Sequence, residues 1–374
     1  MHKRINYYFL LFATLLLLAG GFFLATLSAP ASMQTFGNTS HYIFHQLIAI
    51  AIGLVLASIL FFIPLAWLKK ASPFLLLINL VIMASVLLPF LGVKLLGASR
   101  WISIGGMSLQ PSEFLKITAI LYLSAWLSSK FSDYKKRGML NLAAQTYENF
   151  IKIYLPFVCL LGIISAILLL QKDMSTLAIV IFSLLAIYFV SGTPVWHTIL
   201  SFLGGAAGGF LLIKIEPYRA QRFLVFLHPE TDPLGIGFQL KQSMLAVGSG
   251  GIFGKGLGMS TQKFGHLPQA MSDSVFAIFG EEMGIAGCAA LIILFLLFFW
   301  QGIKIAANST DKFGKLVATG VITWLAVQTF MNIASAIGIW PLAGIPLPFF
   351  SYGGSHIMSE LAAVGLLLNI SKNG

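Results

Sequence analysis

The sequence predicts an all-α membrane protein with about ten transmembrane helices. Of its 374 residues, 58% are hydrophobic and only 9% are charged. The mean hydropathy is +0.90, far above the value for a soluble globular domain. Apolar runs of about twenty residues, the length that a bilayer requires, recur from end to end. We therefore expect a single transmembrane domain that covers residues 1–374.

Ten apolar segments are expected to cross the bilayer. The first is too long for the core of a signal peptide, which favours a retained span. The boundary between the sixth and the seventh depends only on the turn signal at Ser191–Pro194. The ten expected spans are residues 7–28, 43–63, 73–92, 112–129, 153–171, 174–192, 196–214, 273–301, 315–337 and 354–371.

The lysines and arginines predict that both termini lie on the cytoplasmic side, because short cytoplasmic loops carry an excess of these residues. With an even number of spans, the short outer loops hold only Lys94, Arg100 and Lys172. The inner side receives Lys3, Arg4, Lys69, Lys70, Lys130, Lys135, Lys136, Arg137, Lys304, Lys312, Lys315 and Lys372.

The net charge of +11 does not indicate a nucleic-acid partner, because the basic residues are scattered beside the expected lipid headgroups. Cys159 and Cys288 lie inside apolar runs without metal or redox spacing, and we expect packing residues. His45, His266 and His356 are dispersed as well. They also show no metal-ligand spacing, and we expect hydrogen-bonded packing residues.

Residues 215–272 form a long outer connection between the seventh and eighth spans, and connections of this length usually carry function. Its basic residues outnumber its acidic ones, which suits an anionic substrate. Arg219 and Arg222 either grip a phosphate bidentately or anchor the chain to ordinary phospholipid. The glycine-rich run 248–258 predicts a sharply folded loop with close backbone approach, while the spacings of nucleotide-binding loops are absent.

Three carboxylates lie where this connection meets the eighth span. They are Asp273, Glu281 and Glu282, in a chain with few charges. An ionised carboxylate at membrane depth costs about 2.5–3.5 kcal/mol on insertion scales, so its presence indicates function. Asp273 lies at the start of the span, where a side chain can reach both water and a lipid headgroup. We therefore expect it to act on a lipid-borne substrate.

Two further charged groups are expected near the outer ends of spans. Glu113 and Lys116 share one helix face, as a structural ion pair or as the lining of a polar cavity. Asp173 either caps the sixth span or reaches Lys116.

Near the C-terminus, prolines and glycines in residues 338–354 predict non-helical backbone that must be buried in protein or line a wet cavity. Glu360, in the last span, has no assigned role.

Taken in order, these motifs resemble the SEDS family (shape, elongation, division and sporulation) of multispanning peptidoglycan glycan polymerases. The similarity covers nearly the whole chain and is closer to the division type, FtsW, than to the elongation type, RodA. The motifs that carry it are Arg100-Trp101, Gln110 to Lys116, Gln171 with Asp173 and Thr176, Tyr218-Arg219 with Arg222, Gln239 with Gln242, Leu267 to Gly284, and Pro348 to Gly354.

The resemblance implies polymerisation of lipid II outside the bacterial cell membrane during division. A sugar 4-hydroxyl would attack the anomeric carbon of a lipid-linked donor, and undecaprenyl pyrophosphate would leave. The residue that matches the family's catalytic aspartate is Asp273, which we assign as general base. The implied partners are a class B penicillin-binding transpeptidase and other divisome proteins at the septum.

Around Asp273 we expect substrate-binding residues and supporting residues. No spacing indicates a metal site, although Mg²⁺ or Mn²⁺ could help to neutralise the pyrophosphate. The expected substrate-binding residues are Arg100, Arg219, Arg222, Gln242, Lys263, Glu281 and Ser351, and the expected supporting residues are Glu113, Lys116 and Asp173. The chain departs from the family at Met271, Lys172 and Ser175, where histidine, proline and glycine are usual.

Two other classes of function compete with a polymerase. A lipid II flippase would also place polar groups inside a helical bundle. It would require a polar path to the inner face, whereas the charges here cluster toward the outer side. A non-catalytic scaffold would explain the spans but not the costly carboxylates.

Overall fold

A computed structural model describes residues 5–88, 92–95, 98–104, 107–134, 149–215, 217–265 and 267–373 of the chain. Within these residues, a long helix overlaps each of the ten expected spans, so the expected all-α polytopic architecture is confirmed. These helices are α1 (Tyr7–Phe36), α2 (His41–Phe62), α3 (Leu65–Ser85), α4 (Pro111–Tyr134), α6 (Leu155–Leu170) with the preceding π-helix η1 (Phe150–Tyr154), α7 (Met174–Val190), α8 (Val195–Ile215), α11 (Val275–Asn308), α12 (Lys312–Ala336) and α13 (Gly354–Asn373).

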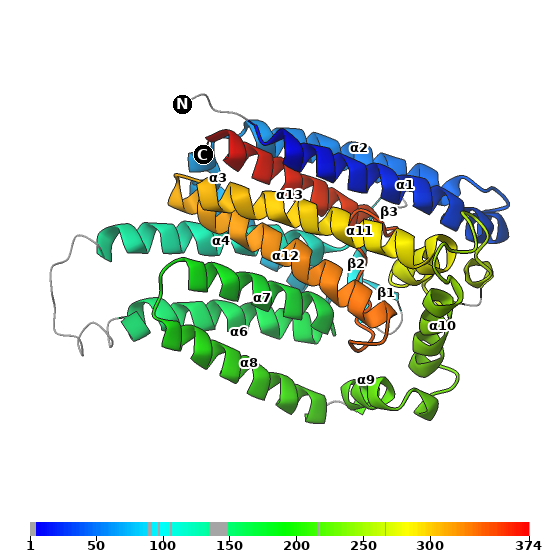
Figure 1. The fold of residues 1–374 in the computed structure, drawn as a ribbon. Helices are drawn as coiled ribbons and strands as arrows, with labels where there is room; N and C mark the ends of the chain where they lie inside the picture. The colour runs from blue at the N-terminus through cyan, green and yellow to red at the C-terminus, as the bar shows by residue number, and fades with distance from the viewer. Residues whose placement is uncertain are drawn as a thin grey trace.

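Six of the described helices are long and apolar enough to cross a membrane by length and composition alone. They are α1, α2, α3, the continuous η1–α6, α11 and α12, and α7 is a shorter apolar helix. The helices run side by side with both termini at one end of the bundle, as an even number of crossings requires (Figure 1).

The expected bounds of the third span were wrong. We expected residues 73–92, but α3 is Leu65–Ser85, directly after Pro64 at its N-cap. Lys69 and Lys70 therefore lie in the first turns of a helix and not in a loop. Residues 74–92 are apolar almost throughout, so the composition does not mark the end of the helix at Ser85.

A small antiparallel sheet precedes α4, which the sequence did not predict. Its strands β1 (Val93–Leu95), β2 (Ala98–Ile104) and β3 (Met107–Leu109) pair in the order β1-β2-β3. It lies at the end of the bundle away from the termini (Figure 1). Its central strand carries Arg100.

The expected outer loop 215–272 is largely helical where it is described. It contains α9 (Pro217–Leu227), the 3-10 turn η2 (Pro229–Thr231), α10 (Ile236–Ser249) and the 3-10 turn η3 (Gln262–Phe264). Helices α9 and α10 also lie away from the termini (Figure 1).

The close backbone approach expected of the glycine-rich run is confirmed. Gly284 interrupts α11 with a φ of 65° and a ψ of −169°, and the loop pairs with the helix there. Ile285 and Ala286 donate their N–H groups to Gly251 and Ile252 at 2.9 and 3.0 Å. A Cβ on Gly284 would lie 2.3 Å from the Gly254 nitrogen. The run therefore docks on a kinked helix.

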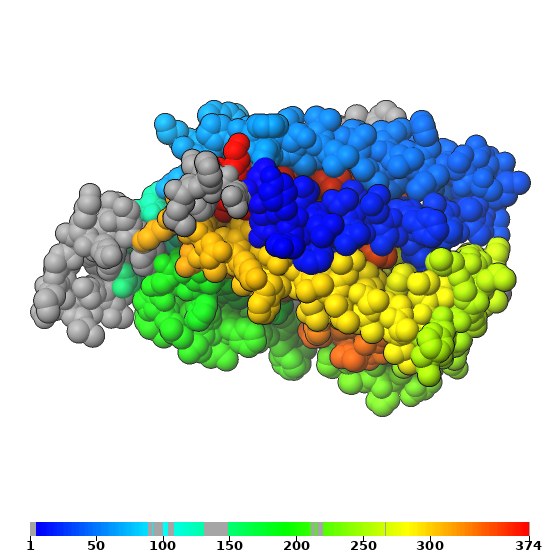
Figure 2. All heavy atoms as spheres, turned by 45° about the horizontal axis from the view of Figure 1, so that its top comes forward, coloured from blue at the N-terminus to red at the C-terminus, as the bar shows by residue number. Residues whose placement is uncertain are grey.

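Helix α13 is the core of the bundle, since nearly all its residues from Ser355 to Ile370 are buried. It packs most closely on α2, where a Cβ on Gly365 would lie 2.2 Å from the Ala57 carbonyl oxygen. On the face of the bundle that Figure 2 shows, α1 and α11 lie side by side. The outward faces of α1, α2 and α3 expose large apolar side chains, as a lipid-facing surface requires.

Candidate active site

The segment 337–353 between α12 and α13 is non-helical and mostly buried, as its prolines and glycines predict. Lipid cannot satisfy the polar groups of such backbone. Side chains of the flanking helices do so instead. Asn332 Nδ2 donates to the Ile345 carbonyl at 2.6 Å, Gln328 Nε2 donates to the Pro346 carbonyl at 3.1 Å, and Glu360 Oε2 accepts the Phe349 N–H at 2.9 Å.

A polar cavity of about 290 Å³ opens beside this segment, and we call it the site cavity. Strand β2, the first turns of α4 and α7, helix α9, residues 269–273 and the segment 344–356 line it. All of these lie at the end of the bundle away from the termini. Its charged or titratable lining residues are Arg100, Glu113, Lys116, Asp173, Arg222, Asp273 and His356.

Asp273 lies just before α11 and is half-buried on the wall of the site cavity. Its segment is held by three successive main-chain carbonyl groups, each of which accepts a hydrogen bond from α12 or the segment 337–353. The Tyr352 N–H donates to Met271 at 2.8 Å, Ser351 Oγ to Ser272 at 2.5 Å, and Asn332 Nδ2 to Asp273 at 3.0 Å. These bonds fix the main chain of Asp273 against the cavity.

Burial raises the pKa of the Asp273 carboxyl to about 6, against the opposing effects of a Ser272 hydrogen bond and of Arg222, Arg100 and His356. A carboxylate with this pKa is ionised near neutral pH and is also a stronger base than an exposed aspartate. Such a match between pKa and working pH is what general-base catalysis requires.

The two described arginines of the expected set lie in the site cavity. Arg100 Nε donates to the Gln171 carbonyl at 3.0 Å, and its Nη2 donates to the Lys172 carbonyl. Arg222 Nη1 donates to the Leu342 carbonyl at 3.4 Å. Arg219 lies one turn before Arg222 in α9, and its side chain is outside the described part of the structure. The cavity therefore combines guanidinium groups with one accessible carboxylate.

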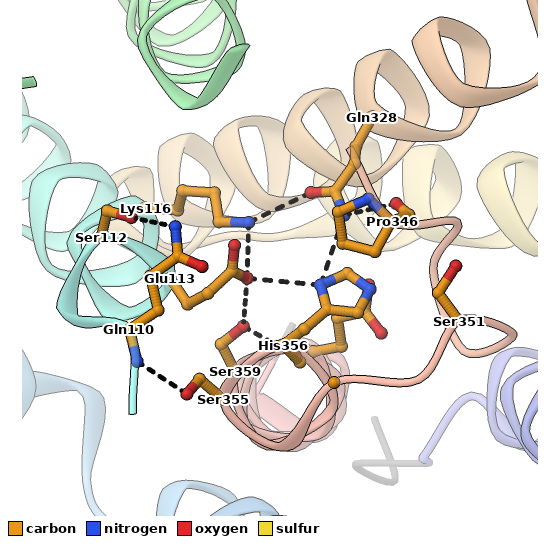
Figure 3. A network of polar contacts seen from close by, with 12 residues as sticks. Gln110, Ser112, Glu113, Lys116, Gln328, Pro346, Ser351, Ser355, His356 and Ser359 are labelled. Carbon is orange, nitrogen blue, oxygen red and sulfur yellow. Dashed lines mark hydrogen bonds and ion pairs between the residues drawn. The ribbon is translucent and has the colours of Figure 1, made fainter. Parts of the chain in front are cut away.

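The first turn of α4 contributes a buried ion pair, in which Lys116 Nζ lies 2.8 Å from Glu113 Oε2. Both interpretations that the sequence left open hold, since the pair is buried and also lines the cavity. Gln328 Oε1 accepts from Lys116 at 3.1 Å and from Trp324 Nε1 at 2.7 Å. The side chains of Glu113, Lys116 and Gln328 converge with His356 of α13 (Figure 3).

Asp173 caps α7, with Oδ1 accepting the Thr176 N–H at 3.2 Å. Its other oxygen accepts from Gln110 Nε2 at 3.2 Å and from Ser112 Oγ at 3.3 Å. The expected cap is therefore present, and Asp173 pairs with Gln110 and Ser112 of the α4 end instead of Lys116. The preceding residue, Lys172, has a φ of 58°, which a proline could not adopt.

Two of the expected substrate-binding residues lie away from the cavity lining. Lys263 is buried, with Nζ 3.2 Å from Glu282 Oε1 and 2.6 Å from the Gly258 carbonyl oxygen. Glu281 is buried too, 2.7 Å from Lys255 Nζ, and also accepts from Ser260 and Thr261. Each charge helps to dock the glycine-rich run on α11, and the expected contact with substrate stays a prediction.

Two others also lie outside the lining. Gln242 is half-buried on α10. Ser351 is fully buried and supports the Asp273 segment through Ser272. Ser351 therefore acts on the site through the main chain.

A divalent cation would find few ligands here. Among the described residues, no group of three or more His, Cys, Asp and Glu side chains could hold a metal ion. Asp273 is flanked by arginines. Mg²⁺ is often bound by one or two carboxylates, with substrate phosphates and water completing the shell, and only this arrangement would fit the residues present.

The sequence interpretation missed His356, Gln328 and Glu360. We expected His356 to be a hydrogen-bonded packing residue. It is buried, and the unexpected feature is its pair of carboxylate neighbours, Glu113 Oε2 at 3.3 Å and Glu360 Oε1 at 3.0 Å. The spacing of four between His356 and Glu360, on one face of an apolar helix, was an available signal. A polar Gln328 in the middle of an apolar span was another.

The chain is similar to a known protein family and to its curated members. The family model described as "Cell cycle protein", which covers FtsW, RodA and SpoVE, matches residues 7–374. A probable peptidoglycan glycosyltransferase FtsW of Thioalkalivibrio sp. is 38% identical over 96% of this chain and 88% of its own length. Stage V sporulation protein E of Bacillus subtilis is 36% identical over 97% of this chain and 96% of its own length.

Solved structures share the fold. A chain from a study of polymerization and crosslinking by a peptidoglycan synthase complex has a TM-score of 0.77 at 24% identity, with 98% of each chain covered. The rod shape determining protein RodA of Thermus thermophilus has a TM-score of 0.70 at 23% identity, over 98% of this chain and 97% of its own. The chain belongs to the FtsW/RodA/SpoVE family of multi-pass membrane proteins, the SEDS family.

Proposed function

We propose that this protein is a peptidoglycan glycosyltransferase that polymerises lipid II at the outer face of the cell membrane. The observation that carries the proposal is Asp273, a carboxylate with a raised pKa in a cavity that also holds two arginines. The relatives named as probable peptidoglycan glycosyltransferases support the same activity.

In the proposed reaction, the 4-hydroxyl of the acceptor N-acetylglucosamine attacks the anomeric carbon of the lipid-linked N-acetylmuramic acid. The new glycosidic C–O bond forms as the bond to pyrophosphate breaks, and Asp273 takes the hydroxyl proton. A positioned base of this kind contributes roughly 10²–10⁴-fold in rate. Undecaprenyl pyrophosphate leaves with the bonding electron pair.

The guanidinium groups of Arg100 and Arg222 would stabilise the charge that develops on the pyrophosphate, since arginine binds phosphate oxygens bidentately. Arg219 belongs to the same helix as Arg222 and is proposed for the same role. Glu113, Lys116 and Asp173 support this cavity from α4 and α7.

The proposed setting is the septum of a dividing cell, with both termini in the cytoplasm. The distribution of lysines and arginines along the sequence supports this orientation. A class B penicillin-binding transpeptidase and other divisome proteins are the proposed partners. The solved structure of a peptidoglycan synthase complex supports a crosslinking partner.

The decisive experiment incubates purified full-length protein, with and without the transpeptidase, with fluorescent lipid II, and resolves polymer from monomer. Wild-type protein should form polymer, and Asp273→Asn should form none while folding normally. A flippase would instead leave lipid II chemically unchanged and move it across a vesicle membrane. Polymer from purified Asp273→Asn protein at the wild-type rate would reject the proposed general base.

A further inference from the structure

His356 lies at the start of α13 between two carboxylates. Its Nδ1 is 3.3 Å from Glu113 Oε2 and its Nε2 is 3.0 Å from Glu360 Oε1. All three side chains are buried, and Glu360 is fully so. Figure 3 shows the imidazole directed at the Glu113 carboxylate. The contact of Nε2 with Glu360 is an ion pair without hydrogen-bond geometry. Of the protonation states of the ring, only the positively charged imidazolium is attracted to both carboxylates.

The balance of charge supports the same protonation state. The buried group contains Glu113, Glu360 and Lys116, so one further cation is needed for neutrality. Buried charges are tolerated when they are paired. Gln328 Nε2 lies 3.4 Å from His356 Nδ1 but has the Pro346 carbonyl oxygen as its acceptor at 3.1 Å. The Glu113 carboxylate, 3.3 Å from the same ring nitrogen, is a charged partner and therefore the stronger one.

The imidazole is also part of the site cavity, which it lines together with Asp273. Positive charge at His356 opposes protonation of that carboxyl. Other described charges face the same space, and they are Arg100 of β2, Glu113 and Lys116 of α4, Asp173 of α7 and Arg222 of α9. His356 differs from the arginines and the lysine because its charge depends on the carboxylates beside it.

We propose that His356 is a positioning residue for the glycosyl transfer, an imidazolium held by Glu113 and Glu360 whose charge keeps Asp273 ionised across the site cavity. Glu360 has a second part in this arrangement, because its other oxygen accepts the Phe349 N–H at 2.9 Å. It thereby ties the imidazolium to the segment 337–353, which holds the main chain of Met271 and Ser272 beside Asp273. The inference rests on the proposed function.

The test measures initial rates of lipid II polymerisation by the full-length protein between pH 5.5 and 8.5. In His356→Gln the acid limb should move up by about one pH unit, because a positive charge near the base is lost. For a midpoint that moves from about 6 to about 7, the rate at pH 6 falls about fivefold relative to wild type, and the deficit shrinks as the pH rises. A purely structural role would lower the rate by the same factor at every pH.

Three further variants sharpen the result. Glu360→Gln should shift the limb in the same direction, because the imidazole loses one of its carboxylates. His356→Lys keeps a positive charge and should retain the wild-type midpoint. Ser359→Ala is the matched control, since it removes only a hydroxyl 3.3 Å from Glu113 Oε2 and no charge, and its midpoint should not move.

A second measurement does not need the substrate. Thermal unfolding of His356→Gln, Glu360→Gln and the double variant should be non-additive, with the double variant losing less than the sum of the two single losses. It also serves if His356→Gln folds poorly. Simple additivity overturns the pairing, and a rate ratio to wild type that is constant with pH overturns the inference. Absence of any polymer from wild-type protein would instead reject the proposed function.

Discussion

The kink of α11 at Gly284 allows a quantitative test of how the glycine-rich run is held near Asp273. Gly284→Ala would force an L-residue into a φ of 65° and a ψ of −169°, a region that costs about 1–3 kcal/mol for residues other than glycine. The new Cβ would lie 2.3 Å from the Gly254 nitrogen and 2.6 Å from the Ile252 carbonyl oxygen. These are main-chain atoms, so the loop itself has to move.

That movement breaks the hydrogen bonds from Ile285 and Ala286 to the loop, each worth about 0.5–1.5 kcal/mol. Together with the backbone strain, we expect a loss of about 2–6 kcal/mol in the free energy of unfolding. The midpoint of thermal unfolding should fall by on the order of 5–10 °C. The rate of lipid II polymerisation should also fall, because residues 259–268 join the displaced run to the Asp273 segment.

The assay is thermal unfolding of the purified protein in detergent, followed by the polymerisation assay at a temperature where both proteins are folded. Gly162→Ala is the matched control, because Gly162 is exposed on α6 and an added Cβ meets nothing within 4 Å. Alanine there should be neutral or slightly stabilising. If Gly284→Ala unfolds at the same temperature as Gly162→Ala, the docking of the run on the kink does not hold the fold together.

Three other predictions concern the site and its support. Burial raises the pKa of Asp273 to about 6, and a general base works only when it is ionised. The polymerisation rate should therefore rise with pH through about pH 6, with a one-proton slope, and then level off. A rate that does not change from pH 5 to 8 would contradict this. Asn332→Leu removes the donor to the Asp273 and Ile345 carbonyls, and we expect kcat to fall about 10- to 100-fold with little change in KM, whereas Thr329→Val on the same helix should have little effect. Lys263→Met leaves Glu282 buried without its lysine and should cost about 3–5 kcal/mol of stability, part of which Lys263→Met with Glu282→Gln recovers; a raised KM for lipid II at unchanged stability would instead support the contact with pyrophosphate.

The sequence was sufficient for the bundle but not for all of its bounds. Ten apolar runs predicted ten long helices, because span length and composition are local properties. The bounds of the third helix were wrong because the apolar run continues past its C-terminal end. The sheet before α4 was missed as well, since its strands are short and depend on pairing that no local pattern shows. Helix α10 was likewise read only as part of a long connection.

The site was predictable in part, from residues whose chemistry is unusual for a membrane. Asp273, Arg100, Arg222, Glu113, Lys116 and Asp173 were all singled out, and the structure brings them to one cavity. Asn332 and Gln328 support the segment 337–353 by contacts across 13 and 18 residues. His356 meets Glu113 across 243 residues. Neither set of contacts can be read from neighbouring residues.

The three carboxylates near the start of α11 have different environments, which the sequence around them does not show. In the sequence, Asp273, Glu281 and Glu282 are equivalent acidic residues within ten positions. In the structure, Glu281 and Glu282 are buried, each neutralised by a lysine and by donors of the glycine-rich run. Their charge is therefore committed to folding.

Asp273 differs because its main chain is held while its side chain lines a cavity. A base must be fixed in place and yet remain open to a hydroxyl from outside. Fixing the residue through its carbonyl, from Asn332, leaves the carboxylate available for that task. What distinguishes the proposed base is therefore the kind of contact that holds it. For this reason Asp273→Asn should abolish turnover and Asn332→Leu should lower it, while Lys263→Met should mainly destabilise the fold.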